Sequence, residues 1–263
     1  MITSVHNSKV QAVRRLQAQA KARREEQVFV VEGVRLAEEA LQAGWTAKQG
    51  FFTDQLDERG KVVVDGFARR GASVEQVSEA VMKALSETEI PQGLLLVVSH
   101  QTLPLPTALH FLLILDGLRD PGNLGTVLRT AVAAGVQAVL LAPGCADAWL
   151  GKVVRAGMGA HFRLPIRSLA WSEINQILKG PSAVLKVYLA DAAGEVLYTQ
   201  ADFKAPLALI IGGEASGAGA EALSLADAKV HIPMPGGSES LNVGIAASIL
   251  LFEVVRQRGS SNT

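Results

Sequence analysis

The chain has 263 residues, of which 49% are apolar and 19% charged, so a sizeable core is available and global disorder is excluded. Its single cysteine, Cys145, excludes a disulfide framework and is expected to be a packed thiol, with no metal site around it. No apolar run approaches the roughly 20 residues that span a bilayer. With no apolar core of a signal peptide near Met1, we expect a cytoplasmic protein without a membrane partner.

Lys and Arg together number 25, as do Asp and Glu, and this balance alone argues against a nucleic-acid partner. The first 24 residues depart from it, because they include basic residues but neither Asp nor Glu. They predict a helix with one cationic side, which is suited to tracking RNA phosphates, although a simple solvated face remains the alternative. The cations assigned to RNA on this helix are Arg14, Arg15, Lys21, Arg23 and Arg24.

Strands and helices alternate through the next part of the chain and predict a small α/β domain. The predicted strands are Gln27–Val31, Phe51–Phe52, Ala72–Val77 and Leu94–Val98, and the predicted helices include Val34–Ala43 and Ser78–Leu85. Two prolines and small polar residues then mark Ser99–His110 as linking sequence. We therefore divide the chain into a domain over 1–100, a linker over 101–108 and a second domain over 109–263.

The second domain is predicted to hold a mostly parallel sheet with helices on both faces. Its predicted strands are Phe111–Leu115, Ala138–Ala142, Arg163–Ile166, Lys186–Ala190, Leu207–Ile211 and Lys229–Ile232. Its predicted helices follow the first strand and then occupy Ala148–Met158, Ser172–Lys179 and Val243–Arg256.

Polar residues collect in the turn between the strand Phe111–Leu115 and the helix that follows it. Asn123 and Arg129 lie about one and a half helical turns apart near the start of that helix, where free backbone N–H groups can meet an anion. From spacing alone, Asn123 could equally be a helix cap, with Arg129 in solvent.

Two later segments have the same character. In LALIIGGEASGAG, a strand breaks into a glycine-rich turn that carries Glu214. In HIPMPGGSESLNV, a Pro/Gly loop leads into a polar cluster and then the last helix. Each of the three segments is a strand end followed by a turn that exposes backbone.

These segments resemble the three motifs of the SpoU (TrmH-type) family of the SPOUT superfamily, which are knotted RNA 2′-O-ribose methyltransferases. The matching residues are Asn123, Gly125 and Arg129 in the first motif; Gly212, Glu214 and Gly217 in the second; and Ile232, Pro233, Met234, Ser240, Leu241, Asn242 and Val243 in the third. The stretches FVVEGVRLAEEA and PQGLLLVV resemble the small substrate-binding domain that precedes the catalytic domain in many ribosomal-RNA members. The chain departs from many relatives at Gly244, where they have Ser.

The resemblance implies an α/β fold with a trefoil knot in the C-terminal domain and S-adenosylmethionine as methyl donor, leaving S-adenosylhomocysteine, with no metal. The residues implied for donor binding are Gly212, Gly213, Ile232, Leu241 and, at a strand end, Leu141. Those implied for catalysis are Asn123, Arg129, Glu214, Ser240 and Asn242. A guanidinium rarely gives up a proton, so we expect Arg129 to clamp a phosphate and act electrostatically, although the family proposal of Arg129 as the activating group stays open.

Other functions fit the residues less well. The glycines of GGEASGAG do not match G-x-G-x-x-G, which argues against a dehydrogenase, and G-x-S-x-G is absent, which argues against Ser240 as a hydrolase nucleophile. A non-catalytic RNA-binding protein is the alternative, but the five catalytic positions are all filled. The extra N-terminal domain favours ribosomal RNA as substrate over tRNA.

The last helix predicts assembly. Its apolar residues are spread around more than one face, so a single sheet can cover only part of it. The resemblance implies a homodimer that uses Val243–Arg256 and completes the RNA site near Asn242 and Arg129.

Overall fold

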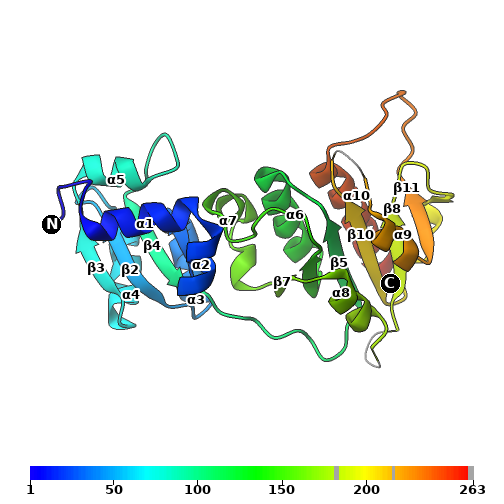
Figure 1. The fold of residues 1–263 in the computed structure, drawn as a ribbon, viewed down its shortest axis with the longest axis horizontal. Helices are drawn as coiled ribbons and strands as arrows, with labels where there is room; N and C mark the ends of the chain where they lie inside the picture. Colours follow the sequence, from blue (N-terminus) through cyan, green and yellow to red (C-terminus); the bar gives the residue numbers. More distant parts are fainter. Residues whose placement is uncertain (181–183, 215–216, 260–263) are drawn as a thin grey trace. The chain divides into compact units, whose positions relative to one another are not determined.

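The computed structural model describes residues 1–180, 184–214 and 217–259 (Figure 1). Two compact units make up the chain: Met1–Thr102 together with Asp147–Arg163, and Leu103–Ala146 together with Leu164–Thr263. We call them unit 1 and unit 2. The division expected at 101–108 does not include this return of 147–163 to unit 1. Among the described residues, no helix combines the length and apolarity needed to cross a membrane.

Unit 1 contains a four-stranded sheet in the order β1-β4-β2-β3. Its strands are β1 (Val28–Glu32), β2 (Ala47–Phe52), β3 (Ser73–Gln76) and β4 (Leu94–Ser99), and its helices are α1 (Ser8–Ala18), α2 (Ala20–Glu26), α3 (Val34–Gln42), α4 (Glu58–Arg69), α5 (Glu79–Leu85) and α7 (Gly151–Gly157). Because β4 runs antiparallel to β1 and β2, whereas β2 and β3 are parallel, the carboxyl ends of β1, β2 and β3 share one edge with the start of β4.

The single N-terminal helix expected from the sequence is two helices. Extended backbone at Gln19 (φ −121°, ψ 110°) separates α1 from α2. The buried face of α1 presents Val10, Val13 and Leu16 to the core. The break therefore divides the cations expected on one stripe between two short helices.

Residues 147–163 complete the core of unit 1 with aromatic rings. The Trp149 ring lies 4.8 Å from Phe29, centroid to centroid, and the Trp45 indole N–H donates to the Phe162 carbonyl at 3.2 Å. His161 is fully buried, and its Nε2 donates to the Ala148 carbonyl at 2.7 Å. Burial, partly opposed by that hydrogen bond and by Asp147, lowers the pKa of His161 to about 4.

Unit 2 contains a seven-stranded sheet, ordered β7-β6-β5-β10-β8-β11-β9, in which every described pair is parallel. Its strands are β5 (Phe111–Asp116), β6 (Ala138–Leu141), β7 (Ile166–Ser168), β8 (Lys186–Ala190), β9 (Val196–Leu197), β10 (Leu207–Gly212) and β11 (Ala228–His231). Its α-helices are α6 (Pro121–Ala133), α8 (Trp171–Leu178), α9 (Ala220–Leu225) and α10 (Val243–Gly259). The 3₁₀ turns are η1 (Ala160–Phe162) in unit 1 and η2 (Tyr198–Gln200) in unit 2.

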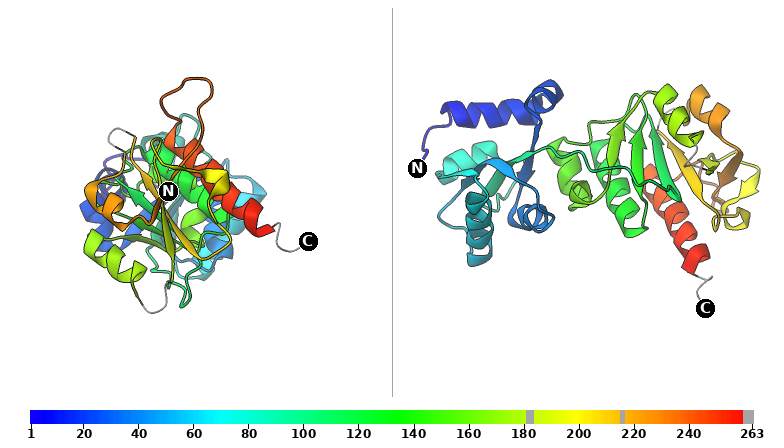
Figure 2. Two further views of the ribbon diagram at one scale, coloured as in Figure 1. Left: turned by 90° about the vertical axis from the view of Figure 1, so that its right-hand side faces the viewer. Right: turned by 90° about the horizontal axis from the view of Figure 1, so that it is seen from below.

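Helices cover both faces of this sheet, as the sequence predicted. In the right-hand view of Figure 2, α8 and α9 lie on one face and α6 and α10 on the other. Ile174 of α8 and Ala222 of α9 pack into a core with Leu112, Ile114 and Ile210 from the central strands. The strand expected at Arg163–Ile166 begins only at Ile166, since Pro165 has no N–H to donate to a neighbouring strand. The family's knot stays an expectation.

Candidate functional site

A cavity of about 630 Å³ opens in unit 2 at the carboxyl ends of β8, β10 and β11. This edge lies beside the β5–β10 pair, where the strand order reverses and where α/β sheets bind ligands (Figure 1). The cavity brings together residues of the second and third motifs, namely Gly212, Gly213, Glu214, Gly217, Ile232, Met234, Ser240, Leu241, Asn242 and Val243. Leu141 is not among the lining residues. It is buried at the end of β6, paired with Leu115.

The two glycines at the end of β10 are required by neighbouring backbone. A Cβ on Gly213 would lie 2.4 Å from the Gly117 carbonyl oxygen, and a Cβ on Gly212 would lie 2.5 Å from Ala218 N and Gly217 C. The Asp116 carboxylate also accepts a hydrogen bond from Gly219 N at 2.7 Å. The crowding therefore comes from the loop itself, which closes tightly on the end of β5. Ala215 and Ser216, at variable positions of the second motif, lie outside the described residues.

Hydrogen bonds join one polar residue from each motif. Asn123 Nδ2 donates to Glu214 Oε1 at 2.9 Å, and Asn242 Nδ2 donates to Asn123 Oδ1 at 3.0 Å. Asn242 Oδ1 also accepts from Gly244 N at 2.9 Å, which caps α10, whereas Asp120 rather than Asn123 caps α6. The three motifs thus form one structure, and both polar groups of the Asn242 amide are occupied within it.

Gly244 lies directly under this cap. A Cβ there would be 3.2 Å from Asn242 Oδ1 and 3.3 Å from Thr126 Cγ2, so a serine would require a small shift of its neighbours. The glycine therefore allows α10 to approach α6 closely at this point.

The structure does not join Arg129 to this network. Arg129 is exposed on α6, and its guanidinium has no hydrogen-bond or ion-pair partner among the described residues. Ser240 is also exposed, and no hydrogen bond of its hydroxyl occurs within the described chain; its carbonyl accepts from the Ser238 hydroxyl at 2.9 Å. Arg129 and Ser240 are therefore free to meet another molecule.

Sequence reasoning missed Asp191, which lines the cavity directly after β8. Its Oδ1 accepts from Ala193 N at 2.9 Å, and its Oδ2 lies 3.8 Å from Lys229 Nζ. An acidic residue directly after a parallel strand was a usable signal, because that end of the sheet is where ligands bind. Among the described residues, no cluster of three or more His, Cys, Asp or Glu side chains could hold a metal ion.

The five N-terminal cations differ in how far they can reach RNA. The Arg23 side chain is only 5% exposed and donates to Asp147 Oδ2 at 2.6 Å and to the Leu16 carbonyl at 2.5 Å. We therefore correct its assignment from RNA contact to structural support of unit 1. Arg15 pairs with Glu26, and Lys21 lies 3.7 Å from Glu25. Arg14 and Arg24 are exposed without an acidic partner in the described chain.

A cavity walled by close backbone turns at the switch point of a parallel sheet defines an α/β protein that binds a small molecule at its strand ends. Comparison with known proteins identifies the class. The model of the SpoU rRNA Methylase family matches residues 110–252, and that of an MRM3-like substrate binding domain matches residues 7–96. The chain belongs to the SpoU rRNA methylase family, whose members transfer methyl groups from S-adenosylmethionine to RNA.

Known rRNA methyltransferases are similar in sequence to this chain over most of its length. A 23S rRNA (guanosine(2553)-2′-O)-methyltransferase of Bacillus subtilis is 35% identical over 96% of this chain and 98% of its own length. The human mitochondrial rRNA methyltransferase 3 is 35% identical over 87% of this chain and 67% of its own. Among solved structures, an AdoMet-bound rRNA methyltransferase from Sinorhizobium meliloti is 33% identical and superposes with a TM-score of 0.88, covering 97% of both chains.

Proposed function

We propose that this protein transfers a methyl group from S-adenosylmethionine to a ribose 2′-hydroxyl of ribosomal RNA. The observation that carries the proposal is the hydrogen-bonded chain Glu214–Asn123–Asn242, which assembles all three family motifs beside one cavity. The ribosomal substrate is supported by what the relatives are named for and by the matched substrate-binding domain.

The residues around the cavity fit the methyl donor. Its volume of about 630 Å³ lies within the roughly 300–1,000 Å³ of small-molecule sites. Gly212 and Gly213 line the cavity with main chain alone, while Ile232 and Leu241 offer an apolar surface for a nucleobase. When bound, S-adenosylmethionine supplies an electrophilic methyl group.

The chain's own residues would align and activate the acceptor hydroxyl. Because the Asn242 amide caps α10 and also donates to Asn123, we assign Asn242 to positioning, and Asn123 and Glu214 to holding the second-motif loop on α6. That leaves the Arg129 guanidinium and the Ser240 hydroxyl to contact RNA. A cation on the neighbouring phosphate lowers the pKa of the 2′-hydroxyl and favours loss of its proton.

We propose that the active form is a homodimer built on α10. Val243, Ala247 and Leu250 face the core of unit 2, whereas Ile245 and Phe252 remain 54% and 49% exposed on the outer face. The exposed face continues to Val255, which is 37% exposed. Thr130 of α6 lies 3.3 Å from Ser248 of α10, oxygen to oxygen, so a partner covering α10 would also come close to Arg129. Light scattering tests this: an active monomer would refute the shared site, and Phe252→Asp should yield an inactive monomer.

In unit 1, we propose that Arg14 and Arg24 contact RNA phosphates, with smaller contributions from the paired Arg15 and Lys21. Charge reversal at Arg14 and Arg24 should flatten the salt dependence of RNA binding. An unchanged salt dependence would show that these arginines are simply exposed to solvent and do not contact RNA.

The deciding experiment is to map 2′-O-methyl groups in total RNA from cells with and without the protein. We expect one ribosomal position to lose its methyl group and the purified protein to restore it. Loss of a methyl group from a tRNA position alone would show that the substrate is tRNA and not ribosomal RNA. Unchanged methylation of every RNA, with RNA binding retained, would favour a non-catalytic member of the fold.

A further inference from the structure

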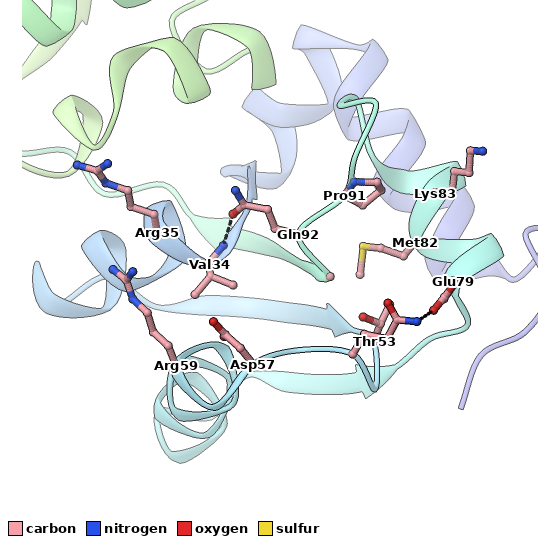
Figure 3. Close-up of a pocket in the computed structure, with 12 residues that line it drawn as sticks. Val34, Arg35, Thr53, Asp57, Arg59, Glu79, Met82, Lys83, Pro91 and Gln92 are labelled. Atoms are coloured by element: carbon pink, nitrogen blue, oxygen red, sulfur yellow. Dashed lines mark hydrogen bonds between the residues drawn. The ribbon is translucent and has the colours of Figure 1, made fainter.

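A second cavity, of about 710 Å³, lies wholly within unit 1 (Figure 3). It occupies the sheet edge at which β1, β2 and β3 end, and where α3, α4 and α5 begin. Its lining residues are Val34, Arg35, Thr53, Gln55, Asp57, Arg59, Glu79, Met82, Lys83, Pro91, Gln92 and Gly93. None of the three motifs contributes to it, so the methyl-transfer site leaves it unexplained.

The floor of this cavity combines apolar surface with free hydrogen-bonding groups. Met82 and Thr53 are 2% and 5% exposed, and Val34 and Pro91 are half-buried beside them. The Thr53 hydroxyl has no hydrogen-bond partner among the described residues. Gln92 Oε1 accepts from Val34 N at 3.1 Å, which orients the side chain and leaves its NH₂ group to donate elsewhere. A flat, partly polar group such as a nucleobase suits this floor.

The rim carries cations at opposite ends. In Figure 3 the Arg35 and Arg59 guanidinium groups lie at one end and Lys83 at the other. Arg59 is paired with Glu38, whereas Arg35 and Lys83 are exposed and have no acidic partner in the described chain. Two carboxylates also line the cavity: Asp57 accepts from Gly60 N at 2.7 Å, and Glu79 accepts from Gln55, both neutral donors that leave the carboxylate charges in place. Arg35 and Lys83 thus place one cation without an ion-pair partner in the described chain at each end of the floor.

We infer that this cavity receives one unpaired nucleotide of the RNA substrate, with its base on the floor and its flanking phosphates on Arg35 and Lys83. The inference rests on the proposed function for the presence of RNA. A nucleic-acid chain that enters and leaves the cavity carries a phosphate on each side of the bound base, and a cation at each end of the floor matches it. Unpaired bases are also what proteins read in RNA, because the edges of paired bases are poorly accessible. The cavity would select RNA by a flipped-out base rather than by phosphate charge alone.

The test uses the full-length protein and unmethylated 23S ribosomal RNA transcribed with 4-thiouridine. Irradiation should cross-link the RNA to peptides that contain Val34, Met82 or Pro91. In filter binding, the double variant Arg35→Glu/Lys83→Glu should weaken RNA binding at least tenfold. Thr53→Val, which removes the hydroxyl with little change of shape, should weaken it about three- to tenfold.

Arg69→Glu is the control, because Arg69 is an exposed cation at the far end of α4 from the cavity; as one charge reversal it is also compared with Arg35→Glu and Lys83→Glu made singly. Equal affinities for the double variant and Arg69→Glu would overturn the inference. A loss with the double variant alone, without any effect of Thr53→Val or any cross-link in the cavity, would also overturn it. If the wild-type protein methylated no RNA, the proposed function would be wrong. The two failures are therefore distinguishable.

Discussion

The two units place their polar side chains differently. In unit 1, Arg23 and His161 are buried and bonded to backbone carbonyls, and Arg23 is also paired with Asp147. In unit 2, Asn123, Glu214 and Asn242 meet at an open sheet edge, and Arg129, further along α6, is exposed and has no partner in the described chain. A buried and paired charged group stabilises the fold, whereas an exposed charged group without a partner is available to bind a ligand. The four predictions below test that distinction.

The largest effect is expected from Arg23→Ala. The substitution removes the cation from Asp147, which is 27% exposed, and the donor from the Leu16 and Gln17 carbonyls, and we expect a combined loss of about 3–5 kcal/mol in the unfolding free energy of unit 1. Chemical denaturation measures it. The neighbouring Arg24→Ala is the control, since an exposed substitution changes stability by about 0.5 kcal/mol or less. Similar losses of unfolding free energy in both variants would show that burial does not distinguish these two cations.

Arg129→Ala should have the opposite profile. Because Arg129 is exposed and unpaired, stability and donor binding should hardly change, but methyl transfer should fall about 100- to 1,000-fold, or about 2.7–4 kcal/mol. Single-turnover assays with saturating RNA measure the chemical step. Arg129→Lys keeps the charge and should retain more activity than Arg129→Ala. A loss of stability without a loss of methyl transfer would show that Arg129 has a structural role, as Arg23 has in unit 1.

The pH dependence of stability sharpens the same comparison. The pKa of His161 is about 4 in the folded protein and about 6.5 when exposed, so the unfolded chain binds a proton first as the pH falls. The stabilisation is complete above pH 6.5 and is lost as the pH drops towards 4, a difference of about 3 kcal/mol. Denaturation curves of the wild type and His161→Gln should diverge over that window. Parallel curves would contradict a buried neutral imidazole.

Gly212→Ala should have the smallest effect of the four. Its Cβ would force the Gly217–Ala218 backbone away from its place in the cavity lining. Crowding of this kind costs about 1–3 kcal/mol, and a donor that has to restore the original loop would bind about 5- to 150-fold more weakly. Calorimetry with S-adenosylhomocysteine measures the loss. Gly236→Ala is the matched control, because its Cβ would have no neighbour within 4 Å. Equal affinities would show that the loop after β10 can relax.

Much of unit 2 could be predicted from sequence, because its strands are continuous apolar runs that end in glycine-rich turns. The second and third motifs also predicted about half of the cavity lining, but the residues after β8, including Asp191, were missed, and the predicted Leu141 does not line the cavity. Sequence pattern alone could not show which charged side chains form ion pairs in the fold. Arg23 and Arg24 are adjacent and chemically identical, yet only Arg23 meets Asp147, more than a hundred residues further along the chain. Burial of that kind depends on contacts with no local signature.

The return of residues 147–163 to unit 1 constrains how this protein can be divided or recombined. The polypeptide passes from one unit to the other three times, so neither unit is a continuous cassette. A fragment that ends at residue 102 would lack Trp149 and Phe162, and one that begins at residue 103 would carry them without Phe29 and Trp45. Genetic exchange of the substrate-binding domain between relatives would therefore have to transfer both segments together. Selection should accordingly treat 1–102 and 147–163 as a single unit of inheritance.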